Sequence, residues 1–413
     1  MFAGWPEYNG HSHDIPGIKF TYPQHPKFWF AKIYRQGRSQ PMISFGPMSI
    51  TLLLCALQGS VLAGLLFRTR RNQAANRCLA FFIIAFVALI TPYIIGYAGF
   101  YDKWPWLSFA PFSYTLAFGP LIYFYAVSLV DKPPVSQWPH FMPVLLQFLA
   151  YALVFPLPLG TKNWWDGFAH ASIISPALEF ATLASIAAYG TAASRRYLVY
   201  RRWLGENRTD GVDFDPSWIP KFLIALAIVS MIWLGFMVAN MINPMRDYFD
   251  QFVLYVIFSV LVVYLGIAGW RHSETPFPPM TARETVQTEA GAKPLVSERD
   301  WAGQGLIWLQ QIDEAEHWRD AKLTLSSLAR HLGTNTTYLS RALNDAAGEN
   351  FNAIINRRRV ASIQQRLSSP VETRDMMTLA FDAGFSSKAS FNRAFAEFAG
   401  TSPSAWRLKS HRA

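Results

Sequence analysis

The chain has 413 residues, of which 51% are apolar and only 15% are charged, and it contains 15 Trp. A soluble domain usually carries about 25% charged residues, so this composition excludes a single ordinary globular protein. The net charge of +10 is spread unevenly along the chain. It is +3 over 1–42 (5 Lys and Arg against 2 Asp and Glu), +4 over 43–270 (14 against 10), −4 over 271–320 (5 against 9) and +7 over 321–413 (13 against 6). The two cysteines lie in or beside apolar segments, which excludes a disulfide framework and a thiolate zinc site.

The first 42 residues are basic and show no signal-peptide pattern of a charged segment followed by an apolar one. We expect residues 1–42 to be a disordered tail or not to be translated, with Met42 as the alternative start. A peptide from residues 5–30 in the native protein would exclude the second alternative.

Residues 43–270 are a series of apolar segments separated by short polar breaks. Each segment has about 20 residues, the length that crosses a hydrocarbon core of about 30 Å as a helix. The segments lack the alternation of a barrel strand, and only closed hydrogen bonding is stable in lipid, so helices are expected. The sequence therefore predicts a seven-helix membrane domain over 43–270, with six spans and one re-entrant segment as the alternative. The predicted spans are 43–67, 78–99, 107–130, 141–160, 170–193, 220–242 and 251–270.

Lysine and arginine in the loops predict the orientation, because cytoplasmic loops carry the excess of positive charge. Seven spans with a cytoplasmic C-terminus place eleven Lys and Arg in the inside loops and three in the outside loops: Arg68, Arg70, Arg71, Arg77, Lys132, Arg195, Arg196, Arg201, Arg202, Arg208 and Lys221, against Lys103, Lys162 and Arg246. The prediction is a multi-pass membrane protein whose C-terminal domain lies in the cytoplasm.

The composition changes abruptly after Trp270. Residues 271–299 contain four prolines and few large apolar side chains, which is typical of a flexible linker. Residues 300–319 are predicted to form an amphipathic helix, with Leu306, Leu309 and Ile312 on its apolar face. This helix is expected to cover the next domain, and pairing of two copies of the chain is the alternative.

Residues 320–413 contain the same helical pattern twice. Leu325, Leu328 and Leu332 have the spacing of a short amphipathic helix, Gly333 ends it, and Thr334 is expected to cap a second helix. The second copy has a helix face of Met377, Ala380 and Phe381, a turn at Ala383-Gly384-Phe385, and a helix capped by Ser386 that buries Phe391 and Phe395. A helix from about Phe351 to Leu367 separates the copies and spans about 25 Å. Two helix-turn-helix motifs so joined suit successive major grooves on one face of B-DNA.

The same residues resemble the AraC/XylS family of bacterial transcription regulators. The resemblance covers about 90 residues and rests on these stretches: Leu325-Ser326-Ser327-Leu328-Ala329, Tyr338-Leu339-Ser340-Arg341, Asn350-Phe351 with Asn356, Arg359 and Val360, Ala383-Gly384-Phe385-Ser386-Ser387, Ser390-Phe391-Asn392-Arg393-Ala394-Phe395 and Gly400-Thr401-Ser402-Pro403-Ser404-Ala405-Trp406-Arg407. Leu379 stands where the family usually has Ile, and Trp406 where Tyr or Phe is common. The resemblance implies a small all-helical domain that recognises promoter DNA. Seven-span membrane domains ahead of such a module are familiar from bacterial one-component regulators.

The chemistry of the side chains suggests their roles on DNA. Amides and amines at the start of a recognition helix can read base edges, whereas arginines more often contact phosphates. Expected base contacts are Asn335, Thr336, Thr337, Ser387, Lys388 and Asn392, and expected phosphate contacts are Arg341, Arg357, Arg358, Arg393 and Arg407. Arg359 is the exception, because it follows the inward row of its helix and is expected to be buried and paired.

Polar residues inside the predicted spans are the remaining candidates for a site. A carboxylate in hydrocarbon costs at least a few kcal/mol unless it is paired or neutral, so Glu179 requires an explanation. With Gln147 and Asn240, and with Gln58, it forms either a network of interhelical hydrogen bonds or a membrane sensor site. The sequence contains no HExxH, P-loop, GxSxG or CxxC motif, so we expect no enzymatic activity, no cofactor and no metal.

Together these features predict an all-α protein, a membrane-embedded one-component regulator whose membrane domain senses an unknown small-molecule or membrane signal. The expected partners are double-stranded promoter DNA and the lipid bilayer, with RNA polymerase and a second copy of the chain as further candidates. The alternative is a transporter or integral-membrane enzyme that carries a regulatory DNA-binding tail. Proteolytic release of the C-terminal part through the linker is a third hypothesis.

Overall fold

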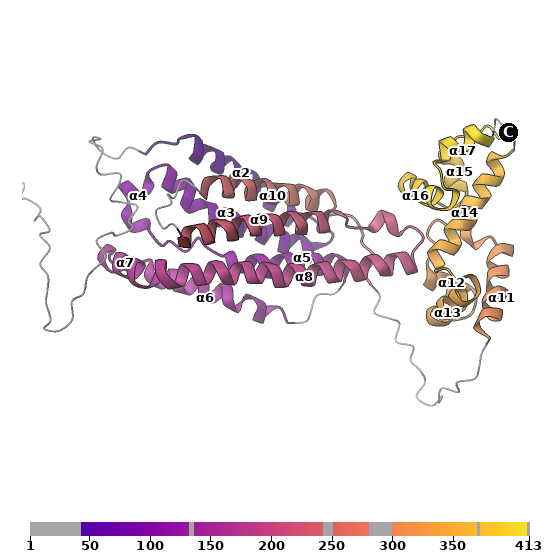
Figure 1. The fold of residues 1–413 in the computed structure, drawn as a ribbon, viewed down its shortest axis with the longest axis horizontal. Helices are drawn as coiled ribbons and strands as arrows, with labels where there is room; N and C mark the ends of the chain where they lie inside the picture. Colours follow the sequence, from indigo (N-terminus) through magenta and orange to yellow (C-terminus); the bar gives the residue numbers. More distant parts are fainter. Residues whose placement is uncertain (1–42, 132–135, 243–250, 281–299, 370–371, 411–413) are drawn as a thin grey trace, which may run out of the picture.

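The computed structural model describes residues 43–131, 136–242, 251–280, 300–369 and 372–410, and all of its regular elements there are helices. A long bundle forms one end of the molecule and a smaller group of helices forms the other (Figure 1). The basic tail 1–42, with the proposed start at Met42, lies outside the described residues. The all-α prediction is confirmed for the part of the chain that is described.

Five of the described helices are long and apolar enough to cross a membrane. They are α2 (Pro47–Phe67), α3 (Gln73–Tyr97), α8 (Ser175–Asn207), α9 (Trp218–Ile242) and α10 (Phe252–Arg271). Helix α8 continues without a break from α7 (Leu159–Trp165) and the π-helix η3 (Asp166–Ile174). Two of the seven predicted spans are shorter: α5 (Phe118–Val130) extends a 3-10 turn at Thr115–Ala117, and α6 (Trp138–Val154) ends just before Pro156. Small elements complete the bundle: α4 (Phe100–Lys103), η1 (Pro105–Leu107) and η4 (Gly211–Phe214). The number of helices that span the membrane remains a prediction.

An aromatic cluster forms the centre of the bundle. Phe82 of α3 contacts Phe118 of α5, and Phe86 of α3 contacts Phe258 of α10, with ring centroids 5.3 and 4.8 Å apart. Phe118 and Phe258 also contact each other, at 5.7 Å. The outward faces are also apolar, and large side chains such as that of Met231 are two-thirds exposed. An apolar exterior of this size would be a liability in water but is expected of helices that face lipid tails.

Helix α8 is longer than the bilayer requires. Its 33 residues extend about 50 Å, whereas a hydrocarbon core is about 30 Å thick. The C-terminal part of α8 carries four arginines and reaches beyond the other helices toward the second group of helices (Figure 1). The predicted span 170–193 is therefore only the first part of a rod that joins the two parts of the molecule.

The predicted linker does not begin at residue 271. Residues 273–280 pack against the bundle: the carbonyl of Ser273 accepts hydrogen bonds from Asn72 and Asn76, Phe277 is buried against Trp218, and the amide of Met280 donates to the carbonyl of Val130. The prolines of this stretch thus belong to an ordered turn. The rest of the predicted linker, 281–299, lies outside the described residues.

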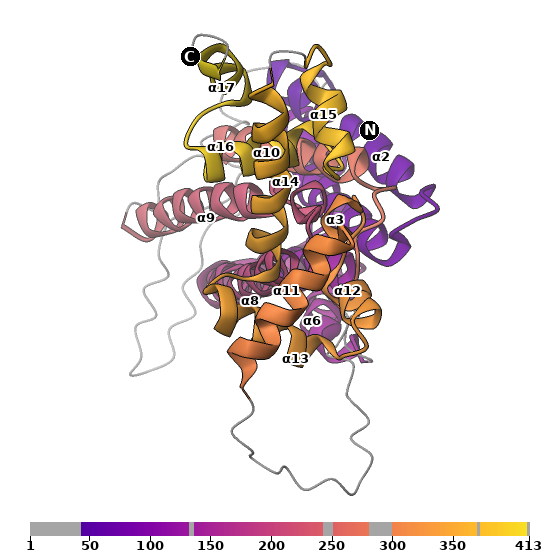
Figure 2. The same ribbon diagram turned by 90° about the vertical axis from the view of Figure 1, so that its right-hand side faces the viewer.

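The second group of helices has two cores that share one helix. Its elements are α11 (Trp301–Glu314), η6 (His317–Arg319), α12 (Leu325–His331), α13 (Thr336–Ala347), α14 (Phe351–Leu367), α15 (Met376–Asp382), α16 (Lys388–Ala399) and α17 (Pro403–Ser410). The first half of α14 contributes Phe351 and Ile355 to the core of α11–α13. Its second half contributes Ile363 and Leu367 to the core of α15–α17. The two halves are therefore arranged along α14 (Figure 2).

Helix α11 covers the first half with Leu309 and Ile312 of the expected apolar face, but Leu306 lies outside the contact. Gly305, Trp308 and Ile312 are buried, whereas Leu306 is 60% exposed. A Cβ atom at Gly305 would lie 2.2 Å from the carbonyl oxygen of Ala342 in α13. The close approach of the two helices, which only glycine allows, sets the register of α11.

We predict that Gly305→Ala displaces α11 and destabilises the first half by about 1–3 kcal/mol, because the added methyl group meets backbone. Hydrogen exchange followed by mass spectrometry should show faster exchange of α11 and α13 amides in the purified full-length protein. Gly205→Ala is the matched control, since its Cβ would meet no atom within 4 Å. Unchanged protection of α11 would contradict this account of the packing.

Candidate DNA-binding site

The first helix-turn-helix unit is formed by α12, a tight turn and α13. Thr324 and Ser327 form a capping box at the start of α12, and Gly333 has a left-handed φ of 64° in the turn. The cap of α13 is Asn335, whose side-chain oxygen accepts the amide of Tyr338 at 2.8 Å. Thr334 is not the cap that the sequence pattern suggested, because the turn is one residue longer.

The second unit repeats this geometry with α15 and α16. Gly384 has a φ of 91°, and a Cβ there would lie 2.5 Å from the carbonyl oxygen of Arg319. The cap of α16 is Ser387, in a capping box with Ser390, and not Ser386. Helix α15 buries Leu379 and Ala380, while Phe381, which was expected to face inward, is 53% exposed.

The predicted base contacts fall into two groups. Thr337, Lys388 and Asn392 are exposed on the outer faces of α13 and α16, and Thr336 is partly exposed. Asn335 and Ser387 use their side-chain oxygens to cap their own helices. Their position at the helix starts remains suitable for a DNA contact, but their side chains already have a structural role.

The predicted phosphate contacts are also of two kinds. Arg393 is exposed on α16, and Arg341 is exposed on α13, where it lies 3.7 Å from Asp345 and over the ring of Trp301. Three others are engaged within the domain: Arg357 pairs with Glu349, Arg358 with Asp313 of α11, and Arg407 donates to the carbonyl of Arg374 at 2.6 Å. The arginine of this set that is best placed to meet a phosphate is therefore Arg393.

Arg359 is buried at the middle of α14, as the sequence pattern predicted, and is 1% exposed. Its Nε donates to the carbonyl of Trp318 at 2.6 Å, and its Nη2 donates to the carbonyl of Asp320 at 2.8 Å. The same Nη2 lies 3.2 Å from Oγ1 of Thr209, which belongs to the loop after α8. Burial lowers the pKa of Arg359 to about 10, against the opposing effect of Asp210 and Asp320.

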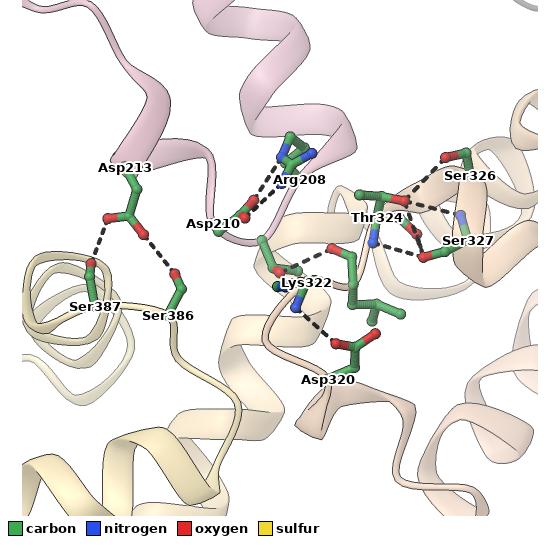
Figure 3. A network of polar contacts seen from close by, with 12 residues as sticks. Arg208, Asp210, Asp213, Asp320, Lys322, Thr324, Ser326, Ser327, Ser386 and Ser387 are labelled. Atoms are coloured by element: carbon green, nitrogen blue, oxygen red, sulfur yellow. Dashed lines mark hydrogen bonds and ion pairs between the residues drawn. The ribbon is translucent and has the colours of Figure 1, made fainter. Parts of the chain in front are cut away.

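The loop after α8 joins the bundle to both halves of the site (Figure 3). The hydroxyl of Thr209 donates to the carbonyl of Leu323 at 3.1 Å, and Arg208 forms an isolated antiparallel bridge with Thr324. The carboxylate of Asp213 accepts hydrogen bonds from the hydroxyls of Ser386, at 2.7 Å, and Ser387, at 2.5 Å. The sequence analysis did not identify this contact. The sequence does contain a signal for it, since Asp210, Asp213 and Asp215 place three acids directly after the arginine-rich end of α8.

A second candidate site lies in the membrane bundle. A cavity of about 520 Å³ is lined by Glu179 and Gln147, which the structure brings together, and by the side chains of Tyr93, Tyr151, His170, Trp233, Gln251 and Tyr255 among others. Gln147 is buried, and its amide group bonds to the backbone amide of Leu116 and to the hydroxyls of Ser113 and Thr115. Gln58 is exposed on α2 and does not line the cavity. Asn240 is in α9, but its side chain lies outside the described residues.

We predict that Arg359→Met destabilises the domain by about 2–5 kcal/mol, because it leaves the buried carbonyl of Trp318 without its donor and removes the charged hydrogen bonds to the carbonyl of Asp320 and the hydroxyl of Thr209. Limited proteolysis of the full-length protein should then degrade the region 300–413 faster. Arg366→Met on the same helix is the control, since Arg366 is partly exposed and pairs with the exposed Asp382 at 3.6 Å, a contact worth about 0–1 kcal/mol. Equal resistance of the two variants would contradict a central role for the buried guanidinium.

Comparison with known proteins identifies the second group of helices. Residues 328–409 match the family model described as a helix-turn-helix domain. No curated protein and no solved structure matches the chain. The matched residues run from α12 to α17 and include both glycine turns and both capped helices. Residues 328–409 therefore form an AraC-type helix-turn-helix domain, a type of domain found in DNA-binding transcription regulators.

Proposed function

We propose that the protein is a membrane-embedded transcription regulator that binds promoter DNA through α13 and α16. The observation that carries this proposal is the pairing of two capped helices, each on its own core, at the two ends of the shared helix α14. The 17 residues of α14 extend about 25 Å, which suits recognition helices in neighbouring major grooves. The net charge of +7 over 321–413 supports attraction to phosphates.

The exposed side chains support a division of roles within the site. We assign base contacts to Thr336, Thr337, Lys388 and Asn392, and phosphate contacts to Arg341 and Arg393. Asn can bind adenine in a bidentate manner and Lys can reach guanine, whereas an arginine on a phosphate positions the protein without reading sequence. Arg357, Arg358 and Arg407 would first have to leave their present partners, so we place them outside the primary contacts.

The apolar bundle supports a location in a bilayer, with the helix-turn-helix domain on the cytoplasmic side where DNA is found. The excess of Lys and Arg in the loops on that side supports the orientation. The combination of a multi-pass apolar bundle and an AraC-type DNA-binding domain supports our proposal that this bilayer is the bacterial inner membrane.

For the membrane domain we propose a sensory role, with the cavity that contains Glu179 as the ligand site. Its volume of about 520 Å³ is within the range of small-molecule pockets. Among the described residues the lining includes one carboxylate, several hydroxyl and amide groups, aromatic rings, and neither Lys nor Arg. This lining favours a neutral or cationic small molecule with hydrogen-bonding groups over an anion. The cavity lies at the start of α8, and the loop that touches the DNA-binding domain follows its end.

A transporter or membrane enzyme with a regulatory tail is the competing function. It requires flux or conversion of a substrate by the membrane domain in liposomes. The direct contacts between the loop after α8 and the helix-turn-helix domain are expected of either function, so substrate flux or its absence decides between them.

We predict that Asn392→Ala and Arg393→Ala change binding to a DNA sequence selected by the wild-type protein in different ways. Losing a base contact should cost about 1–3 kcal/mol and relax specificity at one position. Losing a phosphate contact should weaken binding to all sequences alike. It should also reduce the slope of the logarithm of the binding constant against the logarithm of the salt concentration by about 1. Fluorescence anisotropy over a salt series measures both. Identical behaviour of the two variants would reject the assigned roles.

We also predict that Glu179→Gln changes the output of a reporter gene placed behind the selected DNA sequence, while DNA affinity of the purified protein stays within about twofold of wild type. Gln58→Ala is the control, because Gln58 lies on the bundle but away from the cavity. If Glu179→Gln leaves the reporter output unchanged in every growth condition, Glu179 is not part of the sensor site.

A further inference from the structure

The carboxylate of Asp213 lies at the start of α16, the second helix proposed to recognise DNA. This carboxylate accepts hydrogen bonds from the hydroxyls of Ser386 and Ser387, which directly precede the first residue of α16 (Figure 3). An anion is stabilised there by the positive end of the helix dipole and by hydroxyl donors. The phosphate of a bound DNA strand would have the same charge and accept the same hydrogen bonds.

The neighbouring contacts hold this loop between the two helix-turn-helix units. Thr209 and Asp210 are buried, and Thr209 bonds both to the guanidinium of Arg359 and to the carbonyl of Leu323. Asp215 is held by the hydroxyl of Tyr197 at 2.9 Å, so the loop is also fixed to the end of α8. The domain is thus attached to the membrane bundle through the same segment that covers the start of α16.

The contact between the loop after α8 and the start of α16 has features of an interface that can open. Asp213 and Ser386 are exposed, and a cavity of about 230 Å³ lined mainly by polar side chains, among them Arg201, Asn350 and Arg393, lies beside the loop. The segment Thr209–Asp215 carries three Asp, whereas residues 321–413 carry a net charge of +7. Asp210 pairs with Arg208 and Asp215 lies 3.9 Å from Arg201, so the contact with the start of α16 is made through Asp213, and a DNA phosphate competes with it for the hydroxyls of Ser386 and Ser387.

From these contacts we infer that the acidic segment Thr209–Asp215 is an autoinhibitory element that excludes DNA from α16 until the membrane domain releases it. The inference rests on the proposed DNA-binding function. In the described arrangement Asp213 takes the place of a phosphate, and DNA binding requires the loop to leave Ser386 and Ser387. A movement of α8 that carries Asp215 away would also draw Asp213 from α16, so a signal at the start of α8 can reach the recognition helix.

The test compares Asp213→Ala with Glu206→Ala in the full-length protein in lipid nanodiscs. Both variants lose one negative charge near the end of α8, but only Asp213 contacts α16, whereas Glu206 is exposed. DNA fragments selected by the wild-type protein serve as the probe. We expect Asp213→Ala to bind them about three- to tenfold more tightly than Glu206→Ala does, because removing the competing contact shifts the equilibrium toward the open domain.

Hydrogen exchange of the peptide that covers 204–216 is the second measurement. Addition of DNA to the wild-type protein should accelerate its exchange, since the loop is displaced. Equal affinity of the two variants, or slower or unchanged exchange with DNA, would overturn the autoinhibitory role while leaving the DNA-binding proposal intact. If neither variant nor the wild type selects any sequence, the proposed function fails and the inference fails with it.

Discussion

The buried guanidinium of Arg359 is the interaction on which the arrangement of the C-terminal part depends. A charged group that is 1% exposed is tolerated only if its donors are paired, and this requirement fixes the carbonyls of Trp318 and Asp320 beside the middle of α14. Those carbonyls belong to the segment between α11 and α12, so the first helix-turn-helix unit is oriented on α14 by the same bonds. The ring of Phe385, in the turn of the second unit, lies under the guanidinium at 5.6 Å. Both units therefore meet at one residue.

The same guanidinium also contacts the membrane bundle through Thr209. This bond matters because α8 is about 20 Å longer than a hydrocarbon core requires, so that its end reaches the C-terminal helices. The excess length of α8 over a span of about 30 Å sets where the loop that follows it contacts the helix-turn-helix domain. A loop that was expected only to carry orientation signals thus becomes the connection between the two parts.

Local sequence patterns were sufficient for much of the fold. Helix α14 occupies Phe351–Leu367, as its apolar spacing predicted, and Gly333 and Gly384 both adopt positive φ in their turns. Where the predictions are wrong, a helix cap is displaced by one residue or a side chain lies on the other face of its helix. The caps are Asn335 and Ser387 instead of Thr334 and Ser386, because both residues of each pair are good caps and only the length of the turn decides between them.

The remaining differences depend on contacts between distant segments, which spacing alone does not contain. Helix α11 buries Gly305 and Trp308 and exposes Leu306, because close approach to α13 outweighs the burial of one leucine. The first part of the predicted linker packs on the bundle through Phe277. The contact of Asp213 with Ser386 joins residues 173 positions apart, so no local pattern predicts it. Glu179 and Gln147 were recognised as unusual in an apolar context, but their shared cavity depends on how the helices pack.

The central claim is that one chain embedded in a membrane recognises specific DNA through two helices. Its most direct test is to incubate the full-length protein in lipid nanodiscs with fragmented genomic DNA and to sequence the fragments that it retains at increasing salt. Because α13 and α16 lie at the two ends of α14, the retained fragments should share a motif with two parts about one helical turn, or 10–10.5 base pairs, apart. Retention of all sequences alike, or of none, at every salt concentration would contradict the account.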